Sequence, residues 1–161
     1  MPLPSKNRAK SPEAGQHPKL DAFVLTDIVS HLLRRAHFRA EAIFADQFGE
    51  TGLTPRQKAL LVSVYQHPGE NQNTLAERIA IDRNSFAEMV NRIVARGLVR
   101  RERSEADARA YELHITEDGL RLIEQVMARD ADVEALIIAP IPEELRPVFI
   151  KCLKTMVGLE R

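Results

Sequence analysis

Hydrophobic side chains recur every three or four positions along most of this chain, the spacing that places them on one face of an α-helix. Proline, glycine and short polar runs separate these segments. The helices expected from the pattern cover residues 20–48, 54–66, 74–79, 82–96, 117–139 and 143–157. The apolar stripes along residues 20–48 and 120–157 are wider than one small domain would cover. The pattern therefore predicts a mainly α protein with apolar faces left over.

The segment from Ile81 to Tyr111 organises the rest of the chain. Asp82 is placed to cap a helix that stops at Gly97. One side of that helix is apolar and carries Phe86, Val90, Ile93 and Val94. The other side is small or polar and carries Asn84, Ala87, Glu88, Asn91 and Ala95. Residues 98–103 and 110–115 then predict two strands joined by a charged loop. Two short helices followed by a hairpin form a winged helix-turn-helix.

Capping residues mark where the other helices begin. Thr54 followed by Pro55 predicts a helix start, because proline at the first helical position gives up an N–H that has no partner there. Thr116 followed by two acids predicts another start, since the helix dipole favours negative charge at that end. Gln72 or Asn73 is expected to lead the short helix at residues 74–79.

These elements predict three regions. Residues 1–19 hold four prolines and almost no large apolar side chain, so we expect a flexible N-terminal tail. The winged helix-turn-helix is expected at residues 51–119. Residues 20–50 and 120–161 are expected to form a helical dimerisation region, because their wide apolar stripes require a second chain to cover them.

Charge indicates a local contact with nucleic acid. The formal net charge is zero, which argues against binding by bulk positive charge. Arginines nevertheless concentrate between residues 92 and 103, where Glu102 is the one acid, whereas the C-terminal third is rich in acids. The arginines of this cluster are Arg92, Arg96, Arg100, Arg101 and Arg103. A basic patch on a neutral protein indicates focused binding.

Composition also bounds the compartment. The chain has no run of about 18 apolar residues and no apolar signal segment near its start, so neither a membrane span nor secretion is expected. A single cysteine, Cys152, excludes an internal disulfide framework and agrees with a reducing compartment. We therefore expect a cytoplasmic protein without a membrane partner.

Several short motifs follow one another in a fixed order. They are Leu53-Thr54-Pro55, Thr74-Leu75-Ala76, Asp82-Arg83-Asn84-Ser85, Arg96-Gly97-Leu98-Val99, Asp107-x-Arg109 and Leu113-x-Ile115-Thr116-x-x-Gly119. Together they resemble the MarR family of bacterial transcriptional regulators over roughly residues 20–161. The resemblance implies a homodimeric winged-helix repressor whose first and last helices intertwine. It also implies a DNA affinity that falls when a small ligand binds between the dimerisation and DNA-binding parts.

On this interpretation, residues 82–96 enter the major groove of double-stranded DNA at a pseudo-palindromic operator. The side chains suited to reading bases are Asn84, Glu88 and Asn91, since Asn can bond adenine and Glu can accept from cytosine. Those suited to phosphate are Arg83, Ser85, Arg92 and Arg101, and Arg103 is a further candidate DNA contact. At least one strand arginine is expected to be structural. Asp107 resembles the family's wing acid, which orients Arg109 for the minor groove. An ordinary solvated helix face and a surface ion pair are the alternatives.

The long first helix offers a hypothesis about the effector. Cationic groups lie beside aromatic rings there, a combination that suits an anionic aromatic compound, either an aromatic acid or its CoA thioester. The candidate effector-binding residues are Arg34, Arg35, His37, Phe38 and Phe44. Solvated arginines on a helix face are the alternative interpretation.

Catalytic, metal and cofactor sites are not predicted. The histidines fall in separate elements or on different sides of one helix, without Cys or acid at ligand spacing, and no phosphate-binding loop or nucleophile motif is present. Cys152 lies on an apolar stripe, so we expect a buried packing cysteine rather than a peroxide sensor. Two alternatives stay open. One is a winged-helix protein-interaction module without DNA binding, which would not need the arginine cluster; the other is a redox- or metal-sensing repressor.

Overall fold

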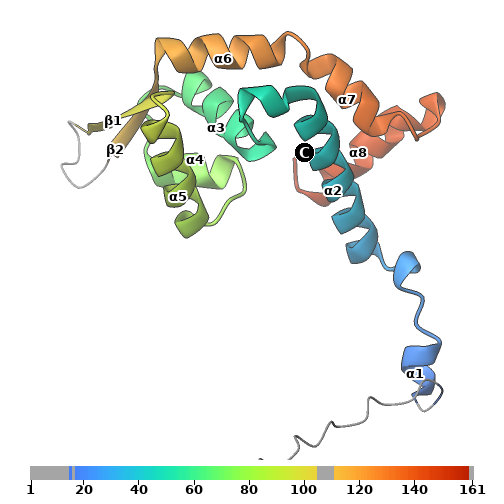
Figure 1. Ribbon diagram of the computed structural model, residues 1–161. Helices are drawn as coiled ribbons and strands as arrows, with labels where there is room; N and C mark the ends of the chain where they lie inside the picture. Colours follow the sequence, from blue (N-terminus) through green and yellow to red (C-terminus); the bar gives the residue numbers. More distant parts are fainter. Residues whose placement is uncertain (1–14, 16, 105–110, 160–161) are drawn as a thin grey trace, which may run out of the picture. The chain divides into compact units, whose positions relative to one another are not determined.

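The computed structural model describes residues 15, 17–104 and 111–159 and divides the chain into two units, residues 1–37 and 38–161. The first unit contains α1 (Pro18–Asp21), a 3-10 turn (Leu25–Asp27) and the start of α2 (Val29–Phe48). The second unit continues through the rest of α2 into the elements labelled in Figure 1. These are α3 (Pro55–Gln66), α4 (Gln72–Arg78), α5 (Arg83–Ala95), β1 (Val99–Arg103), β2 (Tyr111–Ile115), α6 (Glu117–Met127), α7 (Asp130–Ile138) and α8 (Arg146–Met156). The predicted fold class, mainly α with a small hairpin wing, is confirmed.

The hairpin forms an antiparallel pair in which Val99 lies opposite Ile115 and Arg103 lies opposite Tyr111. The predicted strands are therefore correct to within one residue at each end. An isolated β-bridge between Asn71 and Glu112 also places the segment before α4 beside β2. The hairpin therefore contacts the start of α4 and also follows directly after α5.

The expected helix over residues 20–48 is wrong in its first part. The chain has extended dihedral angles at Val24 and Ile28, and α2 begins only at Val29. β-branched side chains lose χ1 freedom in a helix, and Asp27 lies next to another weak helix former, Thr26. The apolar spacing continued through this stretch, but the local backbone preference of these residues ended the helix. Most of the expected tail at residues 1–19 lies outside the described residues, and α1 begins at Pro18.

The expected helix over residues 117–139 is divided into α6 and α7. Arg129 has φ −118° and ψ 3°, outside the helical region. Its Nη2 donates to Gln47 Oε1 at 2.7 Å, and its guanidinium lies 5.7 Å from the centre of the Phe48 ring. The next residue, Asp130, pairs with Lys58 of α3. These contacts to the end of α2 and to α3 stabilise the bend, which the spacing of apolar residues did not indicate.

The predicted caps are confirmed with one exception. Thr54 accepts from Gln57 N while the Gln57 side chain accepts from Thr54 N, which is a capping box. Thr116 Oγ1 accepts from Gly119 N at 3.1 Å. The cap of α4 is Asn71, not Gln72 or Asn73. Asn71 Oδ1 accepts from Thr74 N, and the bridge to Glu112 fixes Asn71 before the helix starts.

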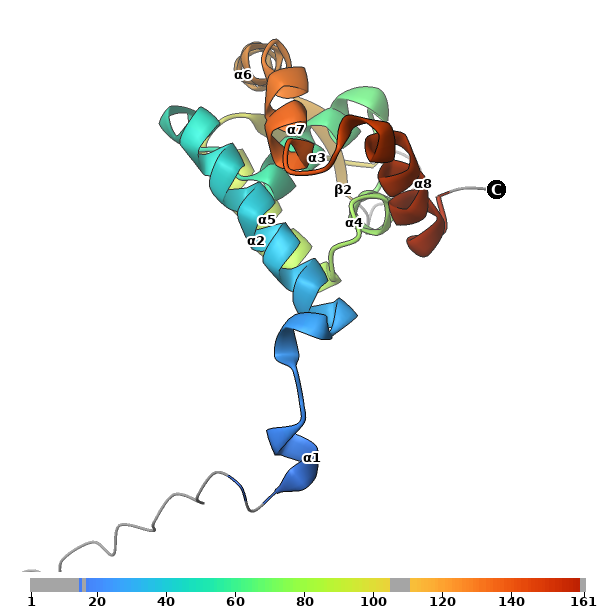
Figure 2. The same cartoon turned by 90° about the vertical axis from the view of Figure 1, so that its right-hand side faces the viewer.

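The core of the second unit joins the helix-turn-helix to the helices around it. α3 lies between α6 and α4 in both views (Figures 1 and 2). Fully buried side chains from five elements meet there, namely Leu60, Leu61, Leu75, Val90, Ile93, Leu113 and Val126. Gly119 marks the tightest approach, because a Cβ at this position would lie 2.1 Å from the carbonyl oxygen of Leu98. The chain therefore passes from the hairpin into α6 with no space for a side chain.

Candidate nucleic-acid interface

The second helix of the helix-turn-helix, α5, begins at a well-formed cap. Asp82 Oδ1 accepts from Ser85 N at 3.0 Å and from Asn84 N at 3.1 Å. The hydrogen bonds from Ser85 and then Asn84 hold the pKa of Asp82 below its ordinary value, because they favour the charged carboxylate. Before it, Ala80 has φ +53°, and Ile81 N donates to Ala76 O at 3.0 Å. The tight turn between α4 and α5 thus sets the direction of α5.

α5 separates its side chains by polarity as the sequence predicts. Phe86, Val90 and Ile93 are buried, and Met89, which the sequence interpretation did not place, is buried with them. Val94 is partly buried. The candidate contact residues of this helix are all exposed, namely Arg83, Asn84, Ser85, Glu88, Asn91 and Arg92. One face of α5 is therefore anchored in the core, and the opposite face offers amides, a hydroxyl and charges to a partner.

The exposed face of α5 continues onto the start of α3. Ser85, Glu88 and Arg92 line a hollow of about 370 Å³ together with Thr54 and Arg56. Arg92 pairs with Glu88 at 3.6 Å, and both side chains are 73% exposed, so solvent weakens this pair. Arg56 was not among the predicted contacts, although it follows directly after the Thr54-Pro55 helix start. Its position places a further cation beside α5.

The wing contacts α5 through one of its arginines. Arg101 is half-buried, and its Nη2 donates to Asn91 Oδ1 at 3.0 Å. The Arg101 guanidinium also lies 5.6 Å from the centre of the Tyr111 ring. Arg103 is exposed on the same side of β1, whereas Arg100 pairs with Glu102 on the opposite side. The candidate wing-tip residues Asp107 and Arg109 lie outside the described residues.

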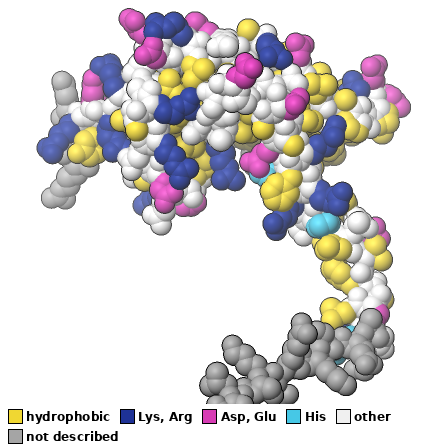
Figure 3. Space-filling model, in the orientation of Figure 1, with side chains coloured by type: hydrophobic (Ala, Val, Ile, Leu, Met, Phe, Trp, Pro, Cys, Tyr) yellow, Lys and Arg dark blue, Asp and Glu magenta, His cyan; other side chains and the backbone are white. Residues whose placement is uncertain are grey.

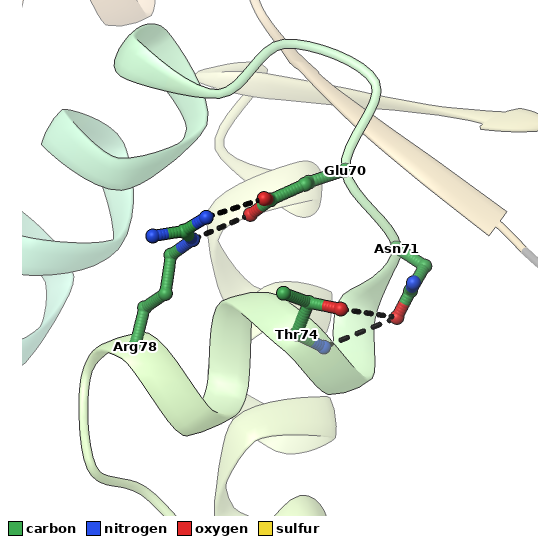
Figure 4. A network of polar contacts seen from close by, with 4 residues as sticks. All are labelled: Glu70, Asn71, Thr74 and Arg78. Atoms are coloured by element: carbon green, nitrogen blue, oxygen red, sulfur yellow. Dashed lines mark hydrogen bonds and ion pairs between the residues drawn. The ribbon is translucent and has the colours of Figure 1, made fainter.

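Two further arginines of this region form hydrogen bonds within the protein. Arg96, at the end of α5, donates from Nη1 to Gly52 O and from Nη2 to Thr51 O, both at 2.8 Å. Arg78, at the end of α4, binds Glu70 through two hydrogen bonds of 2.6 and 2.7 Å (Figure 4). The hydrogen bond from Arg78 holds the pKa of the Glu70 carboxyl below its ordinary value. These arginines stabilise the segments on either side of the helix-turn-helix.

Charge around this site is mixed in sign. Lys and Arg side chains lie over α5 and the hairpin on the face that Figure 3 shows, with carboxylates between them. This arrangement agrees with the neutral net charge of the chain. Local cations can bind phosphate while neighbouring acids discourage unspecific adhesion.

The candidate effector residues are distributed differently from what the sequence suggested. Arg34, Arg35, His37 and Phe38 are exposed on α2. Phe44 is only 4% exposed, and it belongs to the hydrophobic core, where its ring lies 4.9 Å from that of Phe48. A core position leaves the Phe44 ring no surface to offer to a ligand in this structure. We therefore retain only the four exposed residues as effector candidates.

The prediction that Cys152 is buried is wrong for the described chain, in which Cys152 is exposed. Its helix, α8, has no buried residue: within the described part of the chain Phe149 and Leu153 are partly covered, and the rest of its apolar stripe is exposed. Among the described residues, no group of three or more His, Cys, Asp and Glu side chains could hold a metal ion. None of the described helices is both long and apolar enough to cross a membrane.

Comparisons with known proteins agree with this geometry. The sequence profile of the MarR family matches residues 51–110. A transcriptional regulatory protein assigned to the hcr operon of Thauera aromatica is 35% identical over 108 residues, which are 64% of this chain. The chain spans 65% of that relative, slightly less than two thirds of its length.

Two solved structures extend the similarity to nearly whole chains. The PcaV transcriptional regulator from Streptomyces coelicolor, in complex with its natural ligand, has a TM-score of 0.78 at 29% identity and covers 85% of this chain and 96% of its own. The transcriptional repressor CouR, bound to a 23-mer DNA duplex, has a TM-score of 0.75 at 26% identity and covers 83% of this chain and 94% of its own.

Proposed function

Because the chain belongs to the MarR family of winged-helix, DNA-binding transcriptional regulators, we propose that it is a ligand-responsive repressor that binds a pseudo-palindromic operator as a homodimer. Members of this family are regulators rather than enzymes. The observation that carries the proposal is the exposed polar face of α5 beside the arginines of the hairpin. The exposed face of α5 has the residue types that contact bases and phosphates, and the opposite face of the same helix is buried in the core.

In the proposed complex each subunit inserts α5 into a major groove. Asn84, Glu88 and Asn91 contact base edges, and arginines at both ends of the helix contact phosphates. The wing lies along the neighbouring sugar-phosphate backbone of the DNA. The two half-sites are about one turn of the DNA duplex, roughly 10 bp, apart. The similarity to CouR, whose structure contains a DNA duplex, supports this docking mode.

Exposed apolar side chains support the homodimer. In the first unit, Leu20, Phe23, Val24, Leu25, Val29, Leu32 and Leu33 are all exposed. In the second unit, Leu145, Val148, Ile150, Met156, Val157 and Leu159 are exposed on and around α8. Soluble proteins rarely leave so many large apolar groups in water unless another surface covers them. A second copy of the chain is the partner that we propose for both sets.

The proposed effector is an anionic aromatic compound, an aromatic acid or its CoA thioester. Arg34, Arg35 and His37 are exposed groups that can carry positive charge, and Phe38, the next residue in the sequence, is also exposed. A ligand can release DNA only through its differential affinity for the two forms, so about 100-fold weaker DNA binding requires about 2.7 kcal/mol of preference. The same linkage means that bound operator weakens effector binding by an equal factor.

Selection from a random-sequence DNA duplex library tests the DNA-binding part of the proposal. The full chain should enrich a two-fold symmetric sequence, and its affinity for that duplex should exceed its affinity for random duplex by at least about 1000-fold. Enrichment of no sequence would favour the protein-interaction module instead. Aromatic acids and their CoA thioesters can then be tested by thermal shift and by displacement of the selected duplex. If every stabilising compound left the complex intact at saturation, ligand-controlled release would be excluded.

A further inference from the structure

Asn91 and Arg101 lie ten residues apart in sequence but meet between α5 and β1. Arg101 Nη2 donates to Asn91 Oδ1 at 3.0 Å, and this bond joins α5, the helix proposed to enter the major groove, to the hairpin. Both predicted roles, base reading for Asn91 and phosphate binding for Arg101, treated the two side chains as independent. The hydrogen bond makes the orientation of one depend on the other.

The chemistry of the pair allows only one arrangement of the amide. A guanidinium can only donate hydrogen bonds, and the Nδ2 group of asparagine can also only donate. Oδ1 of Asn91 must therefore face Arg101, and Nδ2 must point away from it. Without the arginine, rotation of the exposed carboxamide about its last torsion would exchange donor and acceptor freely. With it, the donor and acceptor stand in a fixed order across the face of α5.

The fixed order matters for reading a base pair. Adenine presents N7 as an acceptor and N6 as a donor in the major groove, and asparagine pairs with both. Oδ1 has two lone pairs, so it can accept from adenine N6 while it still accepts from Arg101. Adenine on the opposite strand presents the same groups in the reverse order, which a fixed carboxamide does not match. Guanine places a second acceptor opposite Oδ1, and cytosine offers only a donor.

We propose that Arg101 is a positioning residue for sequence specificity: by fixing the carboxamide of Asn91, it makes residue 91 read adenine on one strand only. This inference rests on the proposed DNA-binding function. It assigns Arg101 a role that differs from a phosphate contact, because a phosphate contact strengthens binding to all sequences alike.

The surroundings of Arg101 suit a positioning role. The side chain is half-buried between the helix and the sheet, opposite Leu113 in the strand register, and its guanidinium lies 5.6 Å from the Tyr111 ring centre. Its Nε is buried and has no hydrogen-bond partner within the described residues. An unsatisfied buried donor costs stability, so an arginine here is not explained by folding alone. Arg103, exposed on the same side of the strand, offers a matched comparison.

The test uses the full chain and charge-conserving substitutions. Asn91→Ala first identifies the base pair that residue 91 reads, as the position at which selected duplexes lose their preference. Binding is then measured with all four base pairs at that position for the wild type, Arg101→Lys, Arg103→Lys and the double variant Asn91→Ala/Arg101→Lys. Lysine keeps the charge but lacks the planar fork that orients the amide. If the lysine variant melts at a lower temperature than the wild type, Arg101→Met, which keeps an apolar stem but loses the charge, is judged by the base-pair preference alone, since charge loss weakens binding to every duplex.

The wild type should prefer one base pair at this position by about 5- to 150-fold, the range expected for a bidentate asparagine contact. Arg101→Lys should reduce that preference several-fold, and because lysine keeps the charge, its affinity for random duplex should change by a much smaller factor. Arg103→Lys should keep the preference, and the double variant should show no loss beyond that of Asn91→Ala. An unchanged preference in Arg101→Lys, or an equal loss on every duplex including random DNA, would overturn the inference. If the wild type selected no sequence at all, the proposed function itself would fail, and the two failures are therefore distinct.

Discussion

Two amphipathic helices of similar length, α5 and α8, use their apolar faces in opposite ways. α5 buries four side chains in the core and exposes amides, a hydroxyl and charges. α8 buries none of its residues and exposes Val148, Ile150 and Met156. Burial of apolar area stabilises by about 25 cal/mol per Å², so the uncovered face of α8 forgoes a contribution that α5 receives. The difference agrees with the two partners proposed above, DNA for α5 and a second copy of the chain for α8.

Removal of α8 should produce the largest effect. Deletion of residues 142–161 should abolish both the dimer and operator binding, because two α5 helices can no longer span two half-sites. Sedimentation analysis and binding to the selected duplex measure the two losses. Asn91→Ala is the control, since it should remain a dimer. A truncated protein that sedimented as a tight, DNA-binding dimer would show that the face of α8 is not needed for assembly.

Substitutions of single apolar side chains on the two helices should separate folding from association. Phe86→Ala should reduce the free energy of unfolding by about 3–5 kcal/mol, because it opens a cavity in the core. Val148→Ala should act mainly on association, so its unfolding midpoint should return toward that of the wild type as protein concentration rises. Urea denaturation at two protein concentrations distinguishes these responses. Equal, concentration-independent losses in both variants would remove the contrast between the helices.

Removal of one positive charge from each helix should sharpen the contrast in DNA binding. Arg92→Gln on α5 should weaken binding to operator and random duplex alike and reduce the slope of log affinity against log salt by about one. Lys151→Gln, an exposed position on α8, should leave the slope unchanged. Fluorescence anisotropy over a salt series measures both. A similar change in the two variants would mean that charge acts through the whole molecule rather than at α5.

The smallest effect expected is a pH dependence at the start of α5. The pKa of Asp82 is lowered in the folded protein below its ordinary value of 3.8, so its carboxylate stabilises the fold above that pH. This contribution should be lost as the pH falls through the lowered pKa. Asp82→Asn keeps a capping side chain but does not titrate, so the difference between the two proteins should shrink on acidification. A difference that grows below pH 3.8 would contradict this assignment.

The sequence predicted what depends on neighbouring residues. The caps at Thr54, Asp82 and Thr116, the two faces of α5 and the hairpin all follow from spacings of a few positions, and all are present. The break at Arg129 could not be predicted in this way, because contacts to Gln47 and Phe48 stabilise it. The break before Val29 could have been predicted from the β-branched residues around it. The prediction relied instead on the helical spacing of apolar residues, which continues through this stretch.

The sequence was less informative about pairs that meet across elements. The bond between Asn91 and Arg101 requires the actual placement of β1 against α5, so each residue was predicted alone. For a similar reason, Phe44, an expected effector contact, is buried in the core, and Cys152, expected to be buried, is exposed. Both lie on apolar stripes, and periodicity reports which side is apolar but not whether another element of the same chain covers it.

The close approach at Gly119 has a mechanical consequence. Leu98 O accepts from Thr116 N at 3.1 Å, and Thr116 Oγ1 donates to Gly97 O at 2.7 Å, so the segment directly after α5 is hydrogen-bonded to the residue that caps α6. Even a methyl group at residue 119 would push into the Leu98 carbonyl. Close packing and these hydrogen bonds leave the two segments little freedom to rotate relative to each other. We therefore expect a tilt of α6 to be passed on, through this contact, to the segment that follows α5.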